Sequence, residues 1–180
     1  MKITEISSVL LQPISWVIVK VKTDEGITGI GEAYHGAGVH QIVVDERITR
    51  TLVGKDPLNV DRCFRDMMRG QSASGYYQGA VMSAISGIEI ARWHIVGQTL
   101  GRPIYDLIGG PCRDRVRFYS HAATPEECTD LAAKGCTAIK AYFPVGPLPR
   151  GERIEIPRSL SLAEERAALA HMRRCREALG

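Results

Sequence analysis

The spacing of hydrophobic residues changes twice along the chain, and this change limits the possible folds more than any other feature. Over residues 1–34 apolar and polar positions alternate, as at Val17, Val19 and Val21, which is the period of a half-buried strand. The spacing then becomes helical, and after Arg115 strand-like and helix-like segments alternate. This order predicts an α+β unit followed by βα units with parallel strands.

The first part predicts three antiparallel strands followed by three helices. The turn at 23–26 has a glycine where a positive φ is easy, and residues 27–34 form the returning strand. Val44, Ile48 and Leu52 stand four residues apart and predict one helix, which Gly54 ends. A second apolar stripe predicts the next helix, at Val60, Phe64, Met67 and Met68.

The longest predicted helix carries one apolar face through Ala80, Ala84, Ile88, Ala91 and Ile95. Small residues on it should let another element approach closely, namely Gly79, Ser83 and Gly87. We expect three residues to end it, Gly97, Gly101 and Pro103.

The second part predicts two βα units. Residues 116–122 and 136–143 form strands, and the long proline-containing loop 143–158 suggests a functional segment. The helices should begin at two capping motifs, Thr124-Pro125-Glu126-Glu127 and Ser161 with Glu164. Because an eight-unit barrel takes about 250 residues, we expect these two units to be the front part of a longer chain.

Composition excludes several classes of protein. The net charge is only +3 in 180 residues, and no sustained basic stripe favours nucleic-acid binding. No apolar run reaches the roughly 18 residues that a membrane span needs, and the N-terminus lacks the apolar block of a signal peptide. The five cysteines form no C-x-x-C pair, which favours buried or inert thiols and a cytoplasmic location.

A set of motifs, in order along the chain, resembles a known family. The set comprises Lys2-Ile3-Thr4, the hairpin 24–32, Gly54-Lys55-Asp56-Pro57, the segment 84–93, and Gly97, Gly101, Pro103-Ile104-Tyr105 and Leu107-Ile108-Gly109-Gly110, with Arg113-Asp114-Arg115 after them. Together they resemble the enolase superfamily, in its mandelate racemase/muconate lactonizing enzyme group, and within it the galactonate-dehydratase-like acid sugar dehydratases.

The resemblance implies a fold in two parts. Residues 1–112 would be an α+β capping domain, a three-stranded antiparallel sheet plus helices. Residues 113–180 would be the first two βα units of an incomplete TIM-type (β/α) barrel. The implied reaction is abstraction of the proton α to a carboxylate of a sugar acid, followed by loss of water. Such sites use Mg²⁺ with a Lys or His base.

The resemblance also implies site residues. Members carry Lys-x-Lys at the end of the second barrel strand, where this chain has Lys140-Ala141-Tyr142. Lys140 would contact the substrate carboxylate, and Tyr142, in place of the base lysine, would contact substrate or donate a proton. In the capping domain Trp16, Tyr76 and Tyr77 would contact substrate.

Other implications concern residues that depart from the pattern or lie elsewhere. We expect the three acidic Mg²⁺ ligands beyond Gly180, so the chain alone should be inactive. His94 stands where relatives usually have Asp, and we interpret it as a structural variation at the surface. Arg92 replaces a usually apolar residue. An open barrel edge should promote association, and we expect a homo-oligomer.

Two alternatives remain open at this point. One is a racemase, epimerase or cycloisomerase of the same superfamily, which the tyrosine at position 142 disfavours. The other is a non-catalytic fragment or assembly module. Solvent-deuterium exchange without dehydration would distinguish the first alternative, and the coding sequence after codon 180 would distinguish the second.

Overall fold

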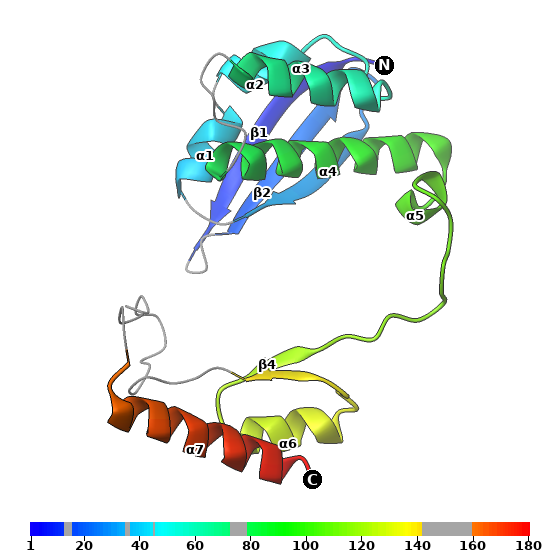
Figure 1. Cartoon of the computed structure of the whole chain (residues 1–180). Coiled ribbons are helices and arrows are strands. Elements are labelled where there is room, and N and C mark those ends of the chain that lie inside the picture. Colours follow the sequence, from blue (N-terminus) through cyan, green and yellow to red (C-terminus); the bar gives the residue numbers. More distant parts are fainter. Residues whose placement is uncertain (13–15, 35–36, 45, 73–78, 142–159) are drawn as a thin grey trace. The chain divides into compact units, whose positions relative to one another are not determined.

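The computed structural model describes residues 1–12, 16–34, 37–44, 46–72, 79–141 and 160–180. Contacts within the chain divide it into two compact units, Met1–Cys112 (unit 1) and Arg113–Gly180 (unit 2). Figure 1 shows the helices and strands of each unit. In the described part, no helix combines the length and the apolar character needed to cross a membrane.

Unit 1 begins with an antiparallel sheet. Strands β1 (Ile3–Leu11), β2 (Trp16–Thr23) and β3 (Thr28–Ala33) lie in the order β1-β2-β3, as the alternation predicts. The β2–β3 turn closes with a hydrogen bond from Thr23 N–H to Ile27 O at 3.1 Å. Gly26 adopts a φ of 81° there, a conformation that a residue with a Cβ rarely takes.

Five helices follow in the described part of unit 1, where the sequence predicts three. They are α1 (Ala37–Val44), α2 (Glu46–Leu52), α3 (Val60–Ser72), α4 (Ala80–Leu100) and α5 (Ile104–Leu107). The four-residue spacing of Val44, Ile48 and Leu52 predicts helical structure correctly but not its division into α1 and α2. Nor does it predict the short α5. Spacing alone carries little information on where one helix stops and another begins.

Helix α4 runs through Gly97, so the prediction that this residue helps to end the helix is wrong. The chain instead leaves the helix at Gly101, which takes the left-handed conformation with a φ of 60°. The N–H of Arg102 then bonds to Gly97 O at 3.0 Å. This is the usual glycine-terminated helix end.

Helix α4 lies on one face of the sheet (Figure 1), and glycines allow its backbone to approach the strands closely. A Cβ on Gly29 would lie 1.9 Å from Ala91 O, and one on Gly31 would lie 2.1 Å from Gly87 O. Gly87 itself faces Ala33, as predicted for a close approach, whereas Gly79 has open space around it. The sheet and α4 share the core, which includes Val17, Val19, Val21, Ile88, Ala91 and Ile95.

Helix α4 also covers the outer edge of β3. His94 Nδ1 accepts a hydrogen bond from Ile30 N–H at 3.0 Å, and Gln98 Nε2 donates to Thr28 O at 2.9 Å. These contacts satisfy backbone groups that an edge strand would otherwise leave open. His94 is therefore an edge-covering residue, which explains its place at the surface.

Arg92 is fully buried in the same helix. Its Nη1 lies 2.5 Å from Glu89 Oε2, and its Nη2 donates to Pro57 O at 3.2 Å. Its Nε is buried without a hydrogen-bond partner. The arginine thus joins α4 to the turn before α3, a role that an apolar residue could not perform.

Unit 2 consists of β4 (Ser120–Ala122), α6 (Pro125–Ala133), β5 (Ile139–Ala141) and α7 (Leu162–Ala178). The two strands pair in parallel, as predicted, but both are shorter than the sequence predicts. Phe118 and Tyr119 are exposed, and β4 pairs with β5 only over Ser120–Ala122. The rest of the predicted second strand, 142–143, lies outside the described residues.

Both predicted helix starts in unit 2 are present. The Thr124 hydroxyl accepts from Glu127 N–H at 3.2 Å, and the Glu127 carboxylate accepts from Ala123 N–H at 2.7 Å. Ser161 and Glu164 form a complete capping box at the start of α7. The helices pack over a small core made of Ala122, Cys128 and Cys175 with Leu131 and Ile139.

Candidate functional site

Lys140 is the middle residue of β5, one position before the strand ends at Ala141. In the register of β4 and β5 its partner is His121. The neighbouring residues Ala122 and Ile139 belong to the core beneath α6 and α7. Because successive side chains of a strand point to opposite faces, Lys140 and His121 share the face that the helices do not cover.

This uncovered face carries a further aromatic group. The rings of Tyr119 and His121 stack with centroids 5.9 Å apart and planes 20° from parallel. Lys140 and His121 are both exposed. An ammonium, an imidazole and a phenol on one face of a parallel strand pair can together bind a carboxylate and move a proton.

His121 is a candidate that the sequence reasoning missed. A histidine at the end of the predicted strand 116–122 was the available signal. The sequence does not show which residue pairs with His121 on the neighbouring strand, and in the structure that residue is Lys140.

Trp16, predicted to contact substrate, is the first residue of β2. It pairs with Leu11 of β1, and its side chain is 47% exposed. The adjacent Val17 is fully buried, so Trp16 lies on the sheet face opposite the core. Val9 is exposed on the same face, and this end of the sheet is therefore apolar.

The other three predicted site residues, Tyr142, Tyr76 and Tyr77, lie outside the described residues. Their assignment stays a prediction. Trp16 belongs to unit 1 and Lys140 to unit 2.

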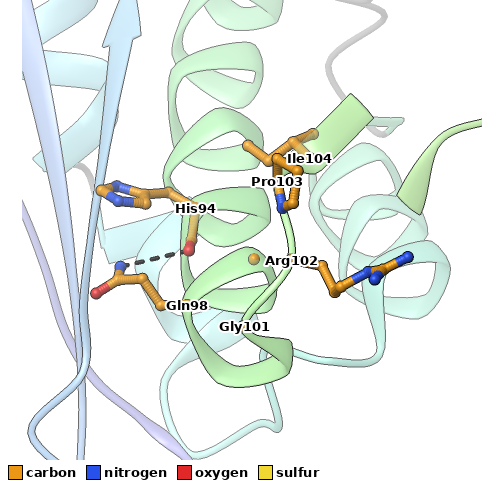
Figure 2. A pocket seen from close by; sticks show the side chains of 7 residues that line it. His94, Gln98, Gly101, Arg102, Pro103 and Ile104 are labelled. Atoms are coloured by element: carbon orange, nitrogen blue, oxygen red, sulfur yellow. Dashed lines mark hydrogen bonds between the residues drawn. The ribbon is translucent and has the colours of Figure 1, made fainter. Parts of the chain in front are cut away.

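A pocket of about 380 Å³ lies at the carboxyl end of α4 and contains none of the predicted site residues (Figure 2). It is lined by His94, Gly97, Gln98, Gly101, Arg102, Pro103 and Ile104. His94 and Gln98 bond to the β3 edge, and Arg102 Nε lies 3.5 Å from Asp106 Oδ2. The polar groups of this pocket therefore serve the fold.

A smaller pocket of about 220 Å³ is lined by Lys55, Asp56, Asn59, Arg62 and Cys63. Lys55 Nζ lies 2.5 Å from Asp66 Oδ2, and the hydrogen bond from Lys55 lowers the pKa of Asp66. Burial raises the pKa of the Cys63 thiol. Both cations of this pocket, Lys55 and Arg62, lie within ion-pair distance of Asp66, and the raised pKa keeps the Cys63 thiol protonated at neutral pH.

Within the described ranges, no three His, Cys, Asp or Glu side chains are grouped so that they could hold a metal ion. The described residues therefore supply no such ligand group, and the resemblance places the Mg²⁺ ligands beyond Gly180.

Comparisons with known proteins agree with the fold described above. Residues 3–109 match the family described as mandelate racemase / muconate lactonizing enzyme, N-terminal domain. The chain is 44% identical over 117 residues to a D-xylonate dehydratase of Haloferax volcanii, covering 65% of this chain and 28% of that protein. It is 40% identical over 123 residues to a D-galactonate dehydratase of Ralstonia pickettii, covering 67% of this chain and 31% of that protein.

Solved structures give the same result. A mandelate racemase/muconate lactonizing enzyme-like protein from Rubrobacter xylanophilus matches with a TM-score of 0.82 and 31% identity, over 99% of this chain and 51% of that one. An enolase of the mandelate racemase subgroup from Agrobacterium tumefaciens matches with a TM-score of 0.80 and 31% identity, over 100% of this chain and 48% of that one.

The chain thus spans about a third of the length of the curated relatives and about half of the solved structures. The match over 3–109 covers more than half of the chain and coincides with the sheet and helices of unit 1. The chain belongs to the mandelate racemase/muconate lactonizing enzyme group of the enolase superfamily.

Proposed function

We propose that this chain supplies the capping domain, residues 1–112, and the first two βα units, residues 113–180, of an acid sugar dehydratase. The whole enzyme would remove the proton α to the carboxylate of a sugar acid and then expel water, which makes it a carbon–oxygen hydro-lyase. The names of the curated relatives, D-xylonate and D-galactonate dehydratase, support this substrate class.

The observation that carries the proposal is the position of Lys140 in β5, one residue before the strand ends and on the face away from α6 and α7. Removing an α-proton places a second negative charge beside the carboxylate. The hydrogen bond from a lysine ammonium to the carboxylate becomes stronger as this charge develops. It therefore stabilises the transition state more than the bound substrate. Lys140 is therefore assigned to the substrate carboxylate.

The remaining site residues have supporting roles in the proposal. Tyr142 would contact substrate or donate a proton, since a phenol is a donor at neutral pH. Trp16, Tyr76 and Tyr77 would contact substrate and contribute to the choice of sugar acid. Of these, Trp16 has a described geometry, an exposed ring on the apolar end of the sheet.

Mg²⁺ is the cofactor that the resemblance implies for the whole enzyme. Because the described residues contain no ligand cluster, no step proposed here is assigned to a metal. For the same reason we propose that the 180-residue chain does not catalyse dehydration alone. We further propose a cytoplasmic homo-oligomer for the whole enzyme.

A screen of sugar acids tests this function. The complete translation product of the gene is incubated with a library of sugar acids and Mg²⁺, and 2-keto-3-deoxy products are trapped with semicarbazide. We expect turnover of at least one sugar acid by the complete product and none by residues 1–180. Solvent-deuterium exchange at the α-carbon without a keto product would instead indicate a racemase, epimerase or cycloisomerase. Absence of both reactions would indicate a non-catalytic assembly module.

A further inference from the structure

Two cysteines that are distant in the sequence meet in the core of unit 2. Cys128 lies on α6 and Cys175 on α7, with exposed fractions of 1% and 3%. Both belong to the small buried cluster that includes Ala122. All five cysteines of the chain are free thiols in this structure.

The two thiols interact with each other, and the Cys175 thiol also contacts an imidazole. Burial, followed by the hydrogen bond with Cys175, raises the pKa of the Cys128 thiol. The Cys175 Sγ lies 3.5 Å from Nε2 of His171, one helical turn earlier on α7. Cys175 therefore has an imidazole nitrogen beside it, which accepts the thiol proton in the tautomer that carries its hydrogen on Nδ1, and a second thiol within interaction range.

We propose that Cys128 and Cys175 are a redox-sensitive pair that forms an intrachain disulfide joining α6 to α7 when a low-molecular-weight disulfide such as oxidised glutathione is present. His171 Nε2 takes the proton of Cys175. The Cys175 thiolate attacks one sulfur of oxidised glutathione, which forms a mixed disulfide and releases one glutathione thiolate. The sulfur of Cys128 then attacks the Cys175 sulfur of the mixed disulfide, the bond to glutathione breaks, and the Cys128 proton passes to the departing glutathione thiolate. Two electrons thus pass from the cysteines to the oxidant, which leaves as two reduced glutathione molecules.

Burial sets the rate of this reaction but does not prevent it. A protonated, buried thiol reacts slowly, so exchange follows transient opening of α7 from α6. In the described part of unit 2 only four hydrophobic residues are buried, Ala122, Cys128, Ala168 and Cys175, and elements with few buried contacts open at low free energy. Closing a long loop then restricts the unfolded chain, so the disulfide stabilises unit 2.

The other cysteines give the proposal its selectivity. Cys63 is buried in unit 1, Cys112 is exposed and Cys136 is half-buried in unit 2. Exposure alone would favour Cys112 as the site of oxidation. Proximity favours Cys128 and Cys175, because a mixed disulfide with glutathione can be resolved within the chain only where a second thiol lies close to it.

Peptide mapping of the oxidised chain tests the proposal. The reduced 180-residue chain is incubated with oxidised glutathione, blocked with an alkylating agent, digested and analysed by mass spectrometry. We expect a crosslink between the peptides of Cys128 and Cys175, with loss of two hydrogens. We also expect slower hydrogen exchange in α7, reversed by dithiothreitol. His171→Gln should slow formation of the crosslink several-fold without changing its final yield.

Two variants serve as matched controls. Cys136→Ser removes another thiol of unit 2 and should leave the crosslink unchanged. Cys175→Ser should abolish it. The proposal is overturned if Cys128 and Cys175 are recovered as alkylated, unoxidised thiols while Cys112 carries glutathione. It is also overturned if the crosslink involves Cys136, or if a Cys128–Cys175 crosslink leaves hydrogen exchange in α7 unchanged. These readouts do not require enzymatic activity, so they are independent of the proposed dehydratase function.

Discussion

His121 and Lys140 are register partners in the parallel pair β4–β5. They occupy the face opposite Ala122 and Ile139, which pack beneath the helices. βα proteins build their sites at the carboxyl ends of their strands, and His121 and Lys140 each lie one position before the end of their strand. In the proposed function, the imidazole would act on the same substrate group as the ammonium of Lys140.

Replacing the imidazole should lower catalysis by the complete enzyme. His121→Phe keeps the aromatic stack with Tyr119 but removes the ring nitrogens. A hydrogen bond to a charged group contributes about 1.5–3 kcal/mol, so kcat/KM for the sugar acid should fall about 10-fold to 100-fold. Steady-state kinetics measure this, with Ser120→Ala, one residue away on the other face, expected to change kcat/KM less than about twofold. An unchanged value for His121→Phe would remove this residue from the site.

The contact between α4 and the sheet should not tolerate a methyl group on β3. In Gly29→Ala the added Cβ would lie 1.9 Å from Ala91 O, so helix and strand must separate. We expect a loss of about 3 kcal/mol in the free energy of unfolding. Urea denaturation followed by tryptophan fluorescence reports on unit 1 alone, because both tryptophans, Trp16 and Trp93, lie there. Gly38→Ala in α1, where a Cβ meets open space, is the control and should be neutral or slightly stabilising.

Truncating the buried arginine should cost more than truncating an exposed one. Arg92→Met removes the bonds to Glu89 and Pro57 O and leaves a carboxylate without its cation in the interior. The expected loss in the free energy of unfolding is about 3–5 kcal/mol, measured by the same fluorescence assay. Arg102→Met, whose parent side chain is 63% exposed, should stay within about 0.5 kcal/mol. Equal effects of the two substitutions would contradict the account of Arg92, and adding Glu89→Leu to Arg92→Met should restore part of the loss.

The pH dependence of stability should reflect the burial of Glu89. Burial raises the pKa of this carboxyl, Arg92 opposes the rise, and nearby Asp61 adds to it, with a net increase above the ordinary value. A raised pKa in the folded state means that the neutral form favours folding, and this contribution is lost as pH rises through the folded-state pKa.

The comparison with Glu89→Gln isolates this titration. From about pH 4, the ordinary range of a glutamate, the stability of the parent chain should fall relative to the variant as pH rises, and then level off. Urea denaturation at a series of pH values measures the difference. A parent chain that gains stability relative to the variant over this range would show that Arg92 outweighs desolvation.

Local signals in the sequence predicted much of the fold. The turn at Gly26 and the caps at Thr124 and Ser161 depend on residues a few positions apart, so their chemistry can be read from the chain directly. The pairing of β1, β2 and β3 follows from alternation and short connections in the same way.

Long-range relationships were beyond sequence reasoning. The need for Gly29 and Gly31 depends on which helix lies over β3, and the role of His94 depends on the backbone that it meets there. The strand at 116–122 was predicted too long because Phe118 alternates correctly but lies outside the paired segment. His121 was not predicted as a site residue because only the register between β4 and β5 places it beside Lys140.

The most direct test of the central claim is the kinetic effect of Lys140→Ala in the complete translation product, with a sugar acid that it turns over. Loss of a donor that acts on developing charge costs about 100-fold to 1000-fold in kcat, and we predict a fall of this size. Lys134→Ala, at the carboxyl end of α6, should have no effect. A kcat and KM for Lys140→Ala equal to those of Lys134→Ala would contradict the assignment of Lys140 to the substrate carboxylate.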